Sequence, residues 1–253
     1  MTLVREVHPT YFTSVPRLWE KIYDGVRSRM DKATGTRRVV RDWALLMGAR
    51  RAAAYDRGRK PSPWVQAQWN LADRIVFSKI RAAIGLDQVK ICVSGSAPVS
   101  PDMLRFFYGL GIEILEGYGL TETTAPATVN RPGAARFGTV GPALPGVELR
   151  IEPDGEVLIK GNNVFTGYLK DEKATSEALA DGWLRSGDVG ELDRDGFLKI
   201  TDRKKDLFKT SGGKYIAPAA MGNTLRGRPG IAPAGVRGDG RPFVAALVPL
   251  DPG

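Results

Sequence analysis

The feature that most constrains this fold is a strand, a helix and a second strand packed into residues 89–115. Valine and isoleucine alternate over residues 89–93, as they do in a strand. Ser100-Pro101-Asp102 then predicts the start of a helix. Ser100 would be its N-cap, Pro101 is tolerated in the first turn, and the charge of Asp102 is favourable at a helix N-terminus. Residues 112–115 predict the second strand. The helix would bury a stripe made of Met103, Phe106, Phe107 and Leu110. This spacing predicts a parallel right-handed crossover, and hence an α/β fold.

Each strand is followed by a loop whose residues suit a nucleotide. The loops are Ser94-Gly95-Ser96-Ala97-Pro98 and Gly117-Tyr118-Gly119-Leu120-Thr121-Glu122. Because ligands of open α/β sheets bind at the carboxyl ends of strands, we expect both loops at one site. Tyr118 offers a flat ring for a base, Thr121 a hydroxyl for phosphate oxygens, and Glu122 a carboxylate for a metal ion.

Two helices are predicted before this unit. The first covers residues 37–57, where Val39, Val40, Trp43, Leu46 and Met47 recur at helical spacing. The second begins with Ser62 as cap and Pro63 at the first position. Its inward residues would be Val65, Trp69, Ala72, Val76, Ile80 and Ala83. Both are expected to cover a sheet.

Beyond residue 130 the pattern changes to short strands and turns. Residues 147–151 and 157–159 flank one turn, and residues 189–192 and 197–200 flank another. The sequence therefore predicts a small β-rich subdomain. Residues 218–242, rich in Gly, Pro and Arg, predict no regular element.

Three further segments carry polar groups at turns. Asp188, in Ser186-Gly187-Asp188, could bind two ribose hydroxyls or be an ordinary turn aspartate. Arg203, in the charged run 202–206, could hold a ribose or phosphate, and a solvated linker is the alternative. Ser211-Gly212-Gly213-Lys214 could cradle phosphate, but the chain has neither a P-loop nor a Gly-x-Gly-x-x-Gly fingerprint. A Rossmann dehydrogenase is therefore not expected.

Composition limits the classes of function. The net charge is +9, and residues 1–60 hold 14 Lys or Arg against 6 Asp or Glu. Such a region can meet anionic lipid, a phosphorylated ligand or nucleic acid, or be a solvated helical face. One cysteine, Cys92, and one histidine, His8, exclude an internal disulfide and a multi-histidine metal site. We expect Cys92 to be buried. With no apolar run of 18 residues and no signal-peptide block, a cytoplasmic location is the default.

These segments, in this order, resemble the adenylate-forming enzyme superfamily, and in particular its AMP-forming acyl-CoA synthetases. The resemblance covers nearly the whole chain. Three segments resemble the bacterial long-chain fatty acid–CoA ligases: residues 15–21, the helical insertion of residues 24–85, and residues 210–218. The implied reaction activates a fatty acid with ATP as an acyl-adenylate and then transfers the acyl group to CoA, with Mg²⁺ as the metal.

The resemblance also implies roles for individual residues. The adenine pocket would be lined by Gly95, Ser96, Ala97 and Pro98, with Tyr118 against the base between Gly117 and Gly119. Thr121 would hold phosphate oxygens, and Glu122 would ligate Mg²⁺. Asp188 and Arg203 would bind the ribose hydroxyls. Lys205 would be the hinge of a C-terminal lid, and Lys209 and the loop 211–213 would serve the thioester-forming arrangement.

The implied architecture is a partial parallel-sheet core with covering helices, a β-rich subdomain and the start of an α+β lid. The expected boundaries are 1–130 for the α/β part, 131–201 for the β-rich part and 202–253 for the lid. The family's N-terminal phosphate loop and the adenylating lysine near the end of the lid have no counterpart here. We therefore expect a truncated ligase, and a complementing N-terminal fragment is one way in which it could be completed.

Other functions stay open on the sequence alone. An aryl-acid ligase or a carrier-loading adenylation domain would use the same nucleotide motifs. A nucleotide-binding remnant would bind adenylate without turnover. Peripheral contact with an anionic membrane at its inner face is a further expectation from the basic region. A nucleic-acid binder is not expected, because no zinc spacing, basic zipper or RNA-binding aromatic motif accompanies the charge.

Overall fold

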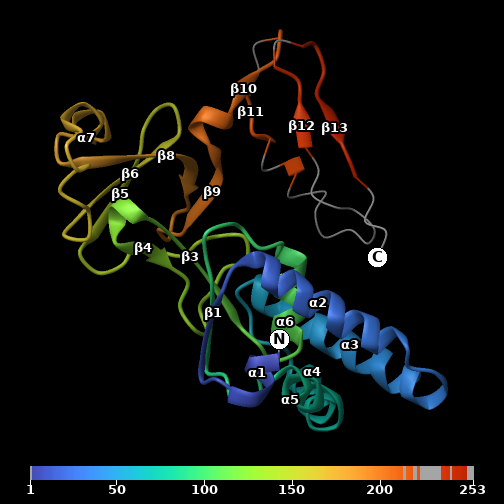
Figure 1. Ribbon diagram of the computed structural model, residues 1–253. Helices are drawn as coiled ribbons and strands as arrows, with labels where there is room; N and C mark the ends of the chain where they lie inside the picture. Colours follow the sequence, from blue (N-terminus) through green and yellow to red (C-terminus); the bar gives the residue numbers. More distant parts are fainter. Residues whose placement is uncertain (1, 213–214, 219–220, 223–234, 240, 250–253) are drawn as a thin grey trace. The chain divides into compact units, whose positions relative to one another are not determined.

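The computed structural model describes residues 2–212, 215–218, 221–222, 235–239 and 241–249 (Figure 1). The chain divides into two compact units. Unit 1 comprises Met1–Glu116 and Arg131–Phe137, and unit 2 comprises Gly117–Asn130 and Gly138–Gly253. Within the described residues, no helix has the length and hydropathy needed to cross a membrane. The domain boundaries expected at residues 130 and 201 stay predictions.

Unit 1 consists of helices and parallel strands. Its helices are α1 (Thr2–Val7), α2 (Pro16–Asp31), α3 (Gly35–Asp56), α4 (Pro63–Ala72), a π-helix (Asp73–Phe77), α5 (Ser78–Ile84) and α6 (Pro101–Gly109). Its strands are β1 (Tyr11–Ser14), β2 (Ile91–Ser94) and the first part of β3 (Ile114–Leu120). Strand β2 pairs in parallel with both β1 and β3. The predicted parallel crossover through α6 is therefore confirmed.

The core of unit 1 is aromatic and aliphatic. Trp19 of α2 is fully buried and meets Phe12 and Phe107 edge-on, with ring centroids 5.2 and 5.4 Å away. Cys92 of β2 is 2% exposed, as expected. Burial raises the pKa of its thiol to about 12, because the thiolate would be desolvated there. This cysteine is therefore a core residue.

Helix α6 begins where the sequence predicts but buries a slightly different face. Pro101 occupies the first turn, but Ser100 makes no side-chain cap bond. The helix buries Met103, Leu104 and Phe107, whereas Phe106 is only half-buried. Helix α6 therefore buries nearly the predicted face, with Leu104 in place of Phe106.

Strand β3 is longer than expected. The strand predicted over residues 112–115 extends to Leu120, through both glycines of the supposed turn. Its first half pairs in parallel with β2 as far as Glu116, and its second half pairs antiparallel with β4 (Ala125–Val129) from Gly117 onward. Pairing with β4 explains why β3 continues to Leu120, because β4 satisfies backbone groups that a turn would leave exposed.

Helix α3 packs through small residues, not through its larger apolar ones. Val39, Val40 and Leu46 are 69%, 40% and 49% exposed, so an inward role for them is wrong. The helix instead buries Ala44, Met47, Gly48 and Ala52. Gly48 meets Gly109 of α6, and a Cβ atom on Gly48 would lie 3.1 Å from the Gly109 carbonyl oxygen. The two helices can approach closely only because both positions lack side chains.

The segment from Pro63 to Ile84 is continuously helical with a shift in its middle. The Ser62 side chain accepts a hydrogen bond from the Val65 amide, which confirms the predicted cap. Its buried residues are Ala72, Phe77 and Ile84, whereas Val76 is half-buried and Ala83 is exposed. The π-turn over Asp73–Phe77 inserts one residue into the helical repeat. Val76 and Ile80 nevertheless pack against the core, as predicted, whereas Ala83 is exposed and its neighbour Ile84 is buried instead.

Unit 2 is built mainly from antiparallel strands. Strands β5 (Val147–Ile151), β6 (Glu156–Gly161), β8 (Trp183–Leu192) and β7 (Leu179–Ala180) form a sheet in that order, and β9 (Leu198–Arg203) also pairs with β8. Helix α7 (Glu172–Ala178) precedes β7. The core includes Val157, Ile159, Leu184 and Leu198. The β-rich subdomain and both of its predicted turns are confirmed.

The rest of unit 2 is described in part. Two short antiparallel pairs are β10 (Phe208–Lys209) with β11 (Tyr215–Ile216), and β12 (Gly235–Arg237) with β13 (Ala245–Leu247). Strand β12 lies where the sequence predicted no regular element. Most of residues 219–234 lie outside the described residues.

The glycine contact between α3 and α6 gives a stability prediction. Gly48→Leu should lower the free energy of unfolding by about 1 to 3 kcal/mol, because the side chain would push the helices apart. Gly25→Leu is the matched control, since Gly25 is an exposed residue of α2 with nothing near its Cβ position. Urea denaturation measures both. Equal stability of the two variants would contradict the close contact.

Candidate functional site

The loop after β2 is anchored at both ends and exposed between them. Ser94 is 1% exposed, and the Val99 amide donates to Oε1 of buried Glu116 at 3.0 Å. Between these anchors Gly95 is half-buried, and residues 96–98 are exposed. Ser96 has φ +70°, in the left-handed region that costs a non-glycine residue energy. The four predicted adenine-loop residues therefore form one surface loop in a fixed conformation.

Gly117 and Gly119 of β3 are explained by the packing of this strand against β4. Strand β3 has a bulge between Tyr118 and Gly119. A Cβ atom on Gly119 would lie 1.9 Å from the Ala125 carbonyl oxygen, which no side chain can tolerate. One on Gly117 would lie 3.3 Å from the Thr128 carbonyl oxygen. Both glycines thus permit the close approach of β4. Whether they also approach a nucleotide stays a prediction.

Thr121 and Glu122 open a single turn of 3₁₀-helix, Thr121–Thr123. Thr121 is exposed, whereas Thr123 is fully buried. The Thr123 hydroxyl accepts a hydrogen bond from the Leu120 amide at 2.8 Å. Oε1 of Glu122 accepts a hydrogen bond from the Tyr168 hydroxyl at 2.7 Å. Thr121 is therefore exposed, and the carboxylate of the adjacent Glu122 is held by Tyr168.

Tyr118, Asp188 and Arg203 meet in unit 2, although 85 positions separate the first from the last. The Tyr118 hydroxyl donates to Oδ2 of Asp188 at 2.7 Å, and Nε of Arg203 lies 2.8 Å from Oδ1. Asp188 lies within strand β8, at an irregularity where the backbone turns through Gly187 (φ +68°), and only 5% of its side chain is exposed. The structure therefore joins three of the predicted site residues through one carboxylate.

The electrostatics of this group follow from burial. Desolvation raises the pKa of Asp188, and the Tyr118 hydrogen bond and the Arg203 charge oppose that rise. Burial, with the nearby Asp188 charge, also raises the pKa of Tyr118. Tyr118 therefore stays a neutral hydrogen-bond donor at neutral pH. The cluster thus holds one anion, Asp188, beside the half-exposed guanidinium of Arg203.

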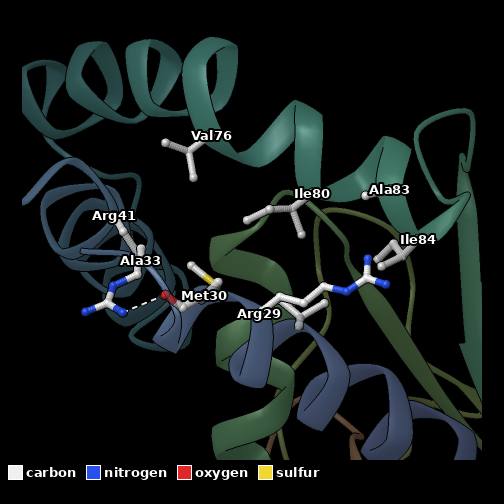
Figure 2. A pocket seen from close by; sticks show the side chains of 9 residues that line it. Arg29, Met30, Ala33, Arg41, Val76, Ile80, Ala83 and Ile84 are labelled. Carbon is white, nitrogen blue, oxygen red and sulfur yellow. Dashed lines mark hydrogen bonds between the residues drawn. The ribbon is translucent and has the colours of Figure 1, made fainter. Parts of the chain in front are cut away.

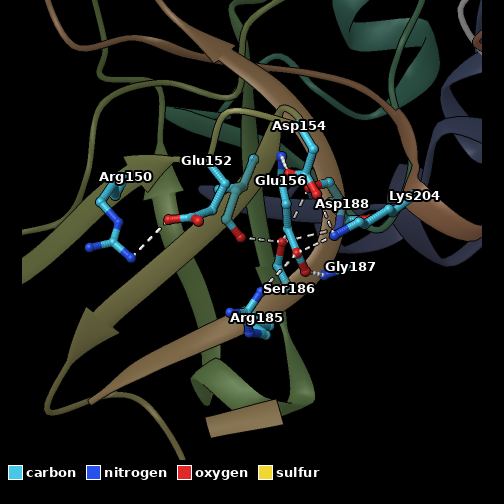
Figure 3. Close-up of polar contacts among 10 residues, drawn as sticks. Arg150, Glu152, Asp154, Glu156, Arg185, Ser186, Gly187, Asp188 and Lys204 are labelled. Atoms are coloured by element: carbon cyan, nitrogen blue, oxygen red, sulfur yellow. Dashed lines mark hydrogen bonds and ion pairs between the residues drawn. The ribbon is translucent and has the colours of Figure 1, made fainter. Parts of the chain in front are cut away.

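A second buried carboxylate, Glu156, supports the turn that carries Asp188 (Figure 3). Oε1 accepts a hydrogen bond from the Gly187 amide at 3.1 Å, and Oε2 lies 2.7 Å from Nζ of Lys204. Lys204 also pairs with Asp154 at 2.8 Å, which raises the pKa of the lysine and lowers that of the aspartate. The sequence analysis missed Glu156. The available signal was an acid directly before the apolar run Val157-Leu158-Ile159.

The residues predicted for the lid are less completely described. Lys205 lies exposed in a 3₁₀ turn, Lys204–Asp206, next to the Lys204 ion pairs. Lys209 lies in β10, but its side chain falls outside the described residues. Ser211 and Gly212 are exposed, and Gly213 and Lys214 fall outside the described residues. The hinge and thioester roles stay predictions.

The donor set suits a magnesium ion that is shared with a substrate. Among the described residues no three His, Cys, Asp or Glu side chains gather as a metal cage. Mg²⁺ is usually bound by one or two carboxylates together with substrate phosphates and water. Glu122, beside the hydroxyl of Thr121, fits that mode.

Unit 1 contains a separate apolar pocket of about 240 Å³ between α2, α3 and the helix over residues 73–84 (Figure 2). Val76 and Ile80 point toward Met30 across its opening. Arg41 at one side donates to the Met30 carbonyl at 2.6 Å and pairs with Asp42. No predicted site residue lines this pocket, and its lining is apolar apart from Arg29 and Arg41.

The Asp188 cluster gives a prediction with a defined pH dependence. Tyr118→Phe should lower the free energy of unfolding by about 1 to 3 kcal/mol at neutral pH, because the buried carboxylate loses a donor. The raised pKa of Asp188 should rise further in the variant. The Asp188 carboxylate of the variant therefore takes up its proton at a higher pH than that of the wild type. The difference in the free energy of unfolding between the two proteins should shrink in acid.

Urea denaturation at neutral and at acid pH measures this difference. Tyr23→Phe is the control, since Tyr23 packs its ring on Phe106 at 4.7 Å and no hydrogen bond of its hydroxyl is recorded. A penalty that grows as the pH falls would contradict the assigned hydrogen bond.

Comparison with known proteins agrees with the motifs. The AMP-binding enzyme family matches residues 1–169. The long-chain-fatty-acid–CoA ligase FadD15 of Mycobacterium bovis is 41% identical over 250 residues, covering 96% of this chain and 40% of that protein. ACSBG2 of Gallus gallus, also a long-chain-fatty-acid–CoA ligase, is 39% identical over 254 residues, covering 98% of this chain and 33% of that protein.

Solved structures show the same fold. o-Succinylbenzoate CoA synthetase from Bacillus subtilis, in complex with its acyl-adenylate, gives a TM-score of 0.61 at 30% identity, over 66% of this chain and 37% of that one. ATP-bound MatB from Rhodopseudomonas palustris gives 0.59 at 33% identity, over 67% and 37%. This chain thus spans 40% or less of the length of these four proteins. Because the family match extends over well more than half of its residues, the chain belongs to the AMP-binding enzyme family.

Proposed function

We propose that this chain carries the adenylate-binding part of a long-chain fatty acid–CoA ligase. In the first step a carboxylate oxygen of the fatty acid attacks the α-phosphorus of ATP; a new O–P bond forms and pyrophosphate leaves. In the second step the CoA sulfur attacks the acyl carbon; a C–S bond forms and AMP leaves. The observation that carries the proposal is the Tyr118–Asp188–Arg203 cluster.

The cluster suits a ribose. A buried carboxylate in a fixed position can accept hydrogen bonds from two neighbouring hydroxyls, and a guanidinium beside it can donate to them. Asp188 is fixed by the Tyr118 hydroxyl and by the turn that Glu156 holds. In this proposal Asp188 and Arg203 bind the ribose, and the ring of Tyr118 lies against the adenine. A role of the loop of residues 95–98 in binding adenine belongs to the same proposal and rests on its motif.

Thr121 and Glu122 would serve the phosphates. Thr121 would donate its hydroxyl to phosphate oxygens, and Glu122 would hold Mg²⁺. The ion would neutralise charge on the phosphates during transfer, which is mainly a matter of positioning and charge stabilisation. The Bacillus synthetase has been solved with ATP and a magnesium ion, which supports this part of the proposal.

The fatty acid substrate and CoA as the acyl acceptor are inferred from relatives. Both curated relatives described above are named as long-chain-fatty-acid–CoA ligases. They favour a long acyl chain and CoA over an aryl acid or a carrier protein. Lys205 as hinge and Lys209 as a residue of the thioester step belong to the same proposal. So do a cytoplasmic location and contact of the basic helices with anionic membrane.

A second candidate is adenylate binding without turnover. It rests on the same cluster, whose three side chains offer hydrogen bonds and charge but no group that reacts with the substrate. The same cluster and loop would then bind a nucleotide for which no complete reaction follows.

Exchange of labelled pyrophosphate into ATP, dependent on palmitate, tests the first step. We expect exchange by the wild type and at least about a 100-fold loss in Glu122→Gln, a cost typical of removing one group that stabilises transition-state charge. Glu122→Gln keeps an oxygen to accept the Tyr168 hydrogen bond but removes the charge. Glu177→Gln, on the exposed face of α7, is the matched control and should leave exchange unchanged.

Binding of a non-reactive palmitoyl-adenylate analogue separates the two candidates. Binding without exchange would favour the second candidate, and neither binding nor exchange would overturn both. In either case Asp188→Asn should weaken binding by about 10- to 100-fold if the cluster holds the ribose, since charged hydrogen bonds contribute about 1.5 to 3 kcal/mol. Exchange that depends on benzoate, or acyl transfer to a carrier protein in place of CoA, would favour the other ligase classes.

A further inference from the structure

The turn that carries Glu122 is held by a segment distant in the sequence. Residues 163–168 follow β6 and lie against the 3₁₀ turn within unit 2. The Phe165 amide donates to the Glu122 carbonyl at 2.8 Å, and Nδ2 of Asn163 donates to the Thr123 carbonyl at 3.2 Å. The Thr124 hydroxyl donates to the Asn163 carbonyl at 3.0 Å. These contacts fix the backbone of the turn.

One contact reaches the carboxylate itself. The Tyr168 hydroxyl donates to Oε1 of Glu122 at 2.7 Å, which is the length of a strong hydrogen bond to a charged acceptor. Among the described residues, Oε2 of Glu122 accepts no recorded hydrogen bond. One oxygen is therefore occupied by the tyrosine, and the other is available to a ligand.

Tyr168 is itself held in place. Its amide donates to Oγ1 of Thr175 at 2.9 Å, and that hydroxyl donates to the Asp171 carbonyl at 2.7 Å. The ring meets Phe165 edge-on, with centroids 4.8 Å apart. Gly167 has φ +148°, and a Cβ atom there would lie 2.7 Å from Cγ2 of Thr175. Glycine is thus required for Tyr168 to reach Glu122 from the segment that precedes α7.

We propose that Tyr168 is a positioning residue for the magnesium ion: it binds Oε1 of Glu122 and directs Oε2 toward the cation. This inference rests on the proposed function, because it assumes that Glu122 is the metal carboxylate. The physical reason is general. A carboxylate on a flexible side chain binds a small cation well only when a second residue fixes its orientation, and loss of such a partner typically lowers metal affinity by about 10- to 100-fold.

The test compares nucleotide binding with and without the cation. Affinity for a non-hydrolysable ATP analogue is measured by calorimetry in Mg²⁺ and in EDTA, for the wild type and for Tyr168→Phe. We expect the Mg²⁺ concentration needed for half-maximal tightening to rise by about 10-fold or more in the variant. The affinity in EDTA should be unchanged, because the phenylalanine keeps the ring contact with Phe165.

Controls make each outcome decisive. Tyr11→Phe changes a 58%-exposed tyrosine in β1 and should behave as wild type. An unchanged Mg²⁺ requirement in Tyr168→Phe would overturn the inference. Equal weakening in Mg²⁺ and in EDTA would do the same, since it would show a role in folding of the site only. If the wild type binds the analogue in neither buffer, the proposed function fails and this inference with it.

Discussion

The structure depends on burying carboxylates and supplying each with donors. An ionised side chain removed from water costs several kcal/mol unless hydrogen bonds and opposite charges replace the lost solvent. Within unit 2, Asp188 obtains its donors from β3 and β9, and Glu156 obtains its donors from the turn in β8 and from Lys204. In unit 1, Glu116 binds the amide of Val99. Each buried acid therefore ties together segments that lie far apart in the sequence, and these are the segments that carry the nucleotide motifs.

The sequence could predict what is encoded locally. The capped start at Ser62, the parallel pairing of residues 92–94 with 114–116, and the hairpins of the β-rich subdomain all depend on short patterns. Several site residues were recognisable for the same reason, because motif order carries information that single residues do not. The meeting of Tyr118, Asp188 and Arg203 is consistent with that order, although no local rule requires their contact.

What could not be predicted depends on tertiary contacts. The π-turn after Ala72 inserts a residue into the helix, and Ile84 is buried near its end in place of the predicted Ala83. Nothing in the apolar pattern reveals the insertion. Val39 and Leu46 fit a helical stripe, yet Gly48 and Ala52 make the contact, because a close helix crossing needs small residues. Glu156 and Tyr168 were missed since each acts on a predicted site residue through the fold: one supports the turn at Asp188, the other holds Glu122.

Cys92 has a practical consequence. It is the sole cysteine of the chain, it is 2% exposed, and burial raises its pKa to about 12. Since the thiolate is the reactive form, maleimides and disulfide reagents should find almost no target in the native fold. A cysteine introduced at any exposed position would then be the single site of modification. Fluorophores or spin labels could thus be attached one at a time, and the native thiol need not be removed from the core, where its loss would leave a void.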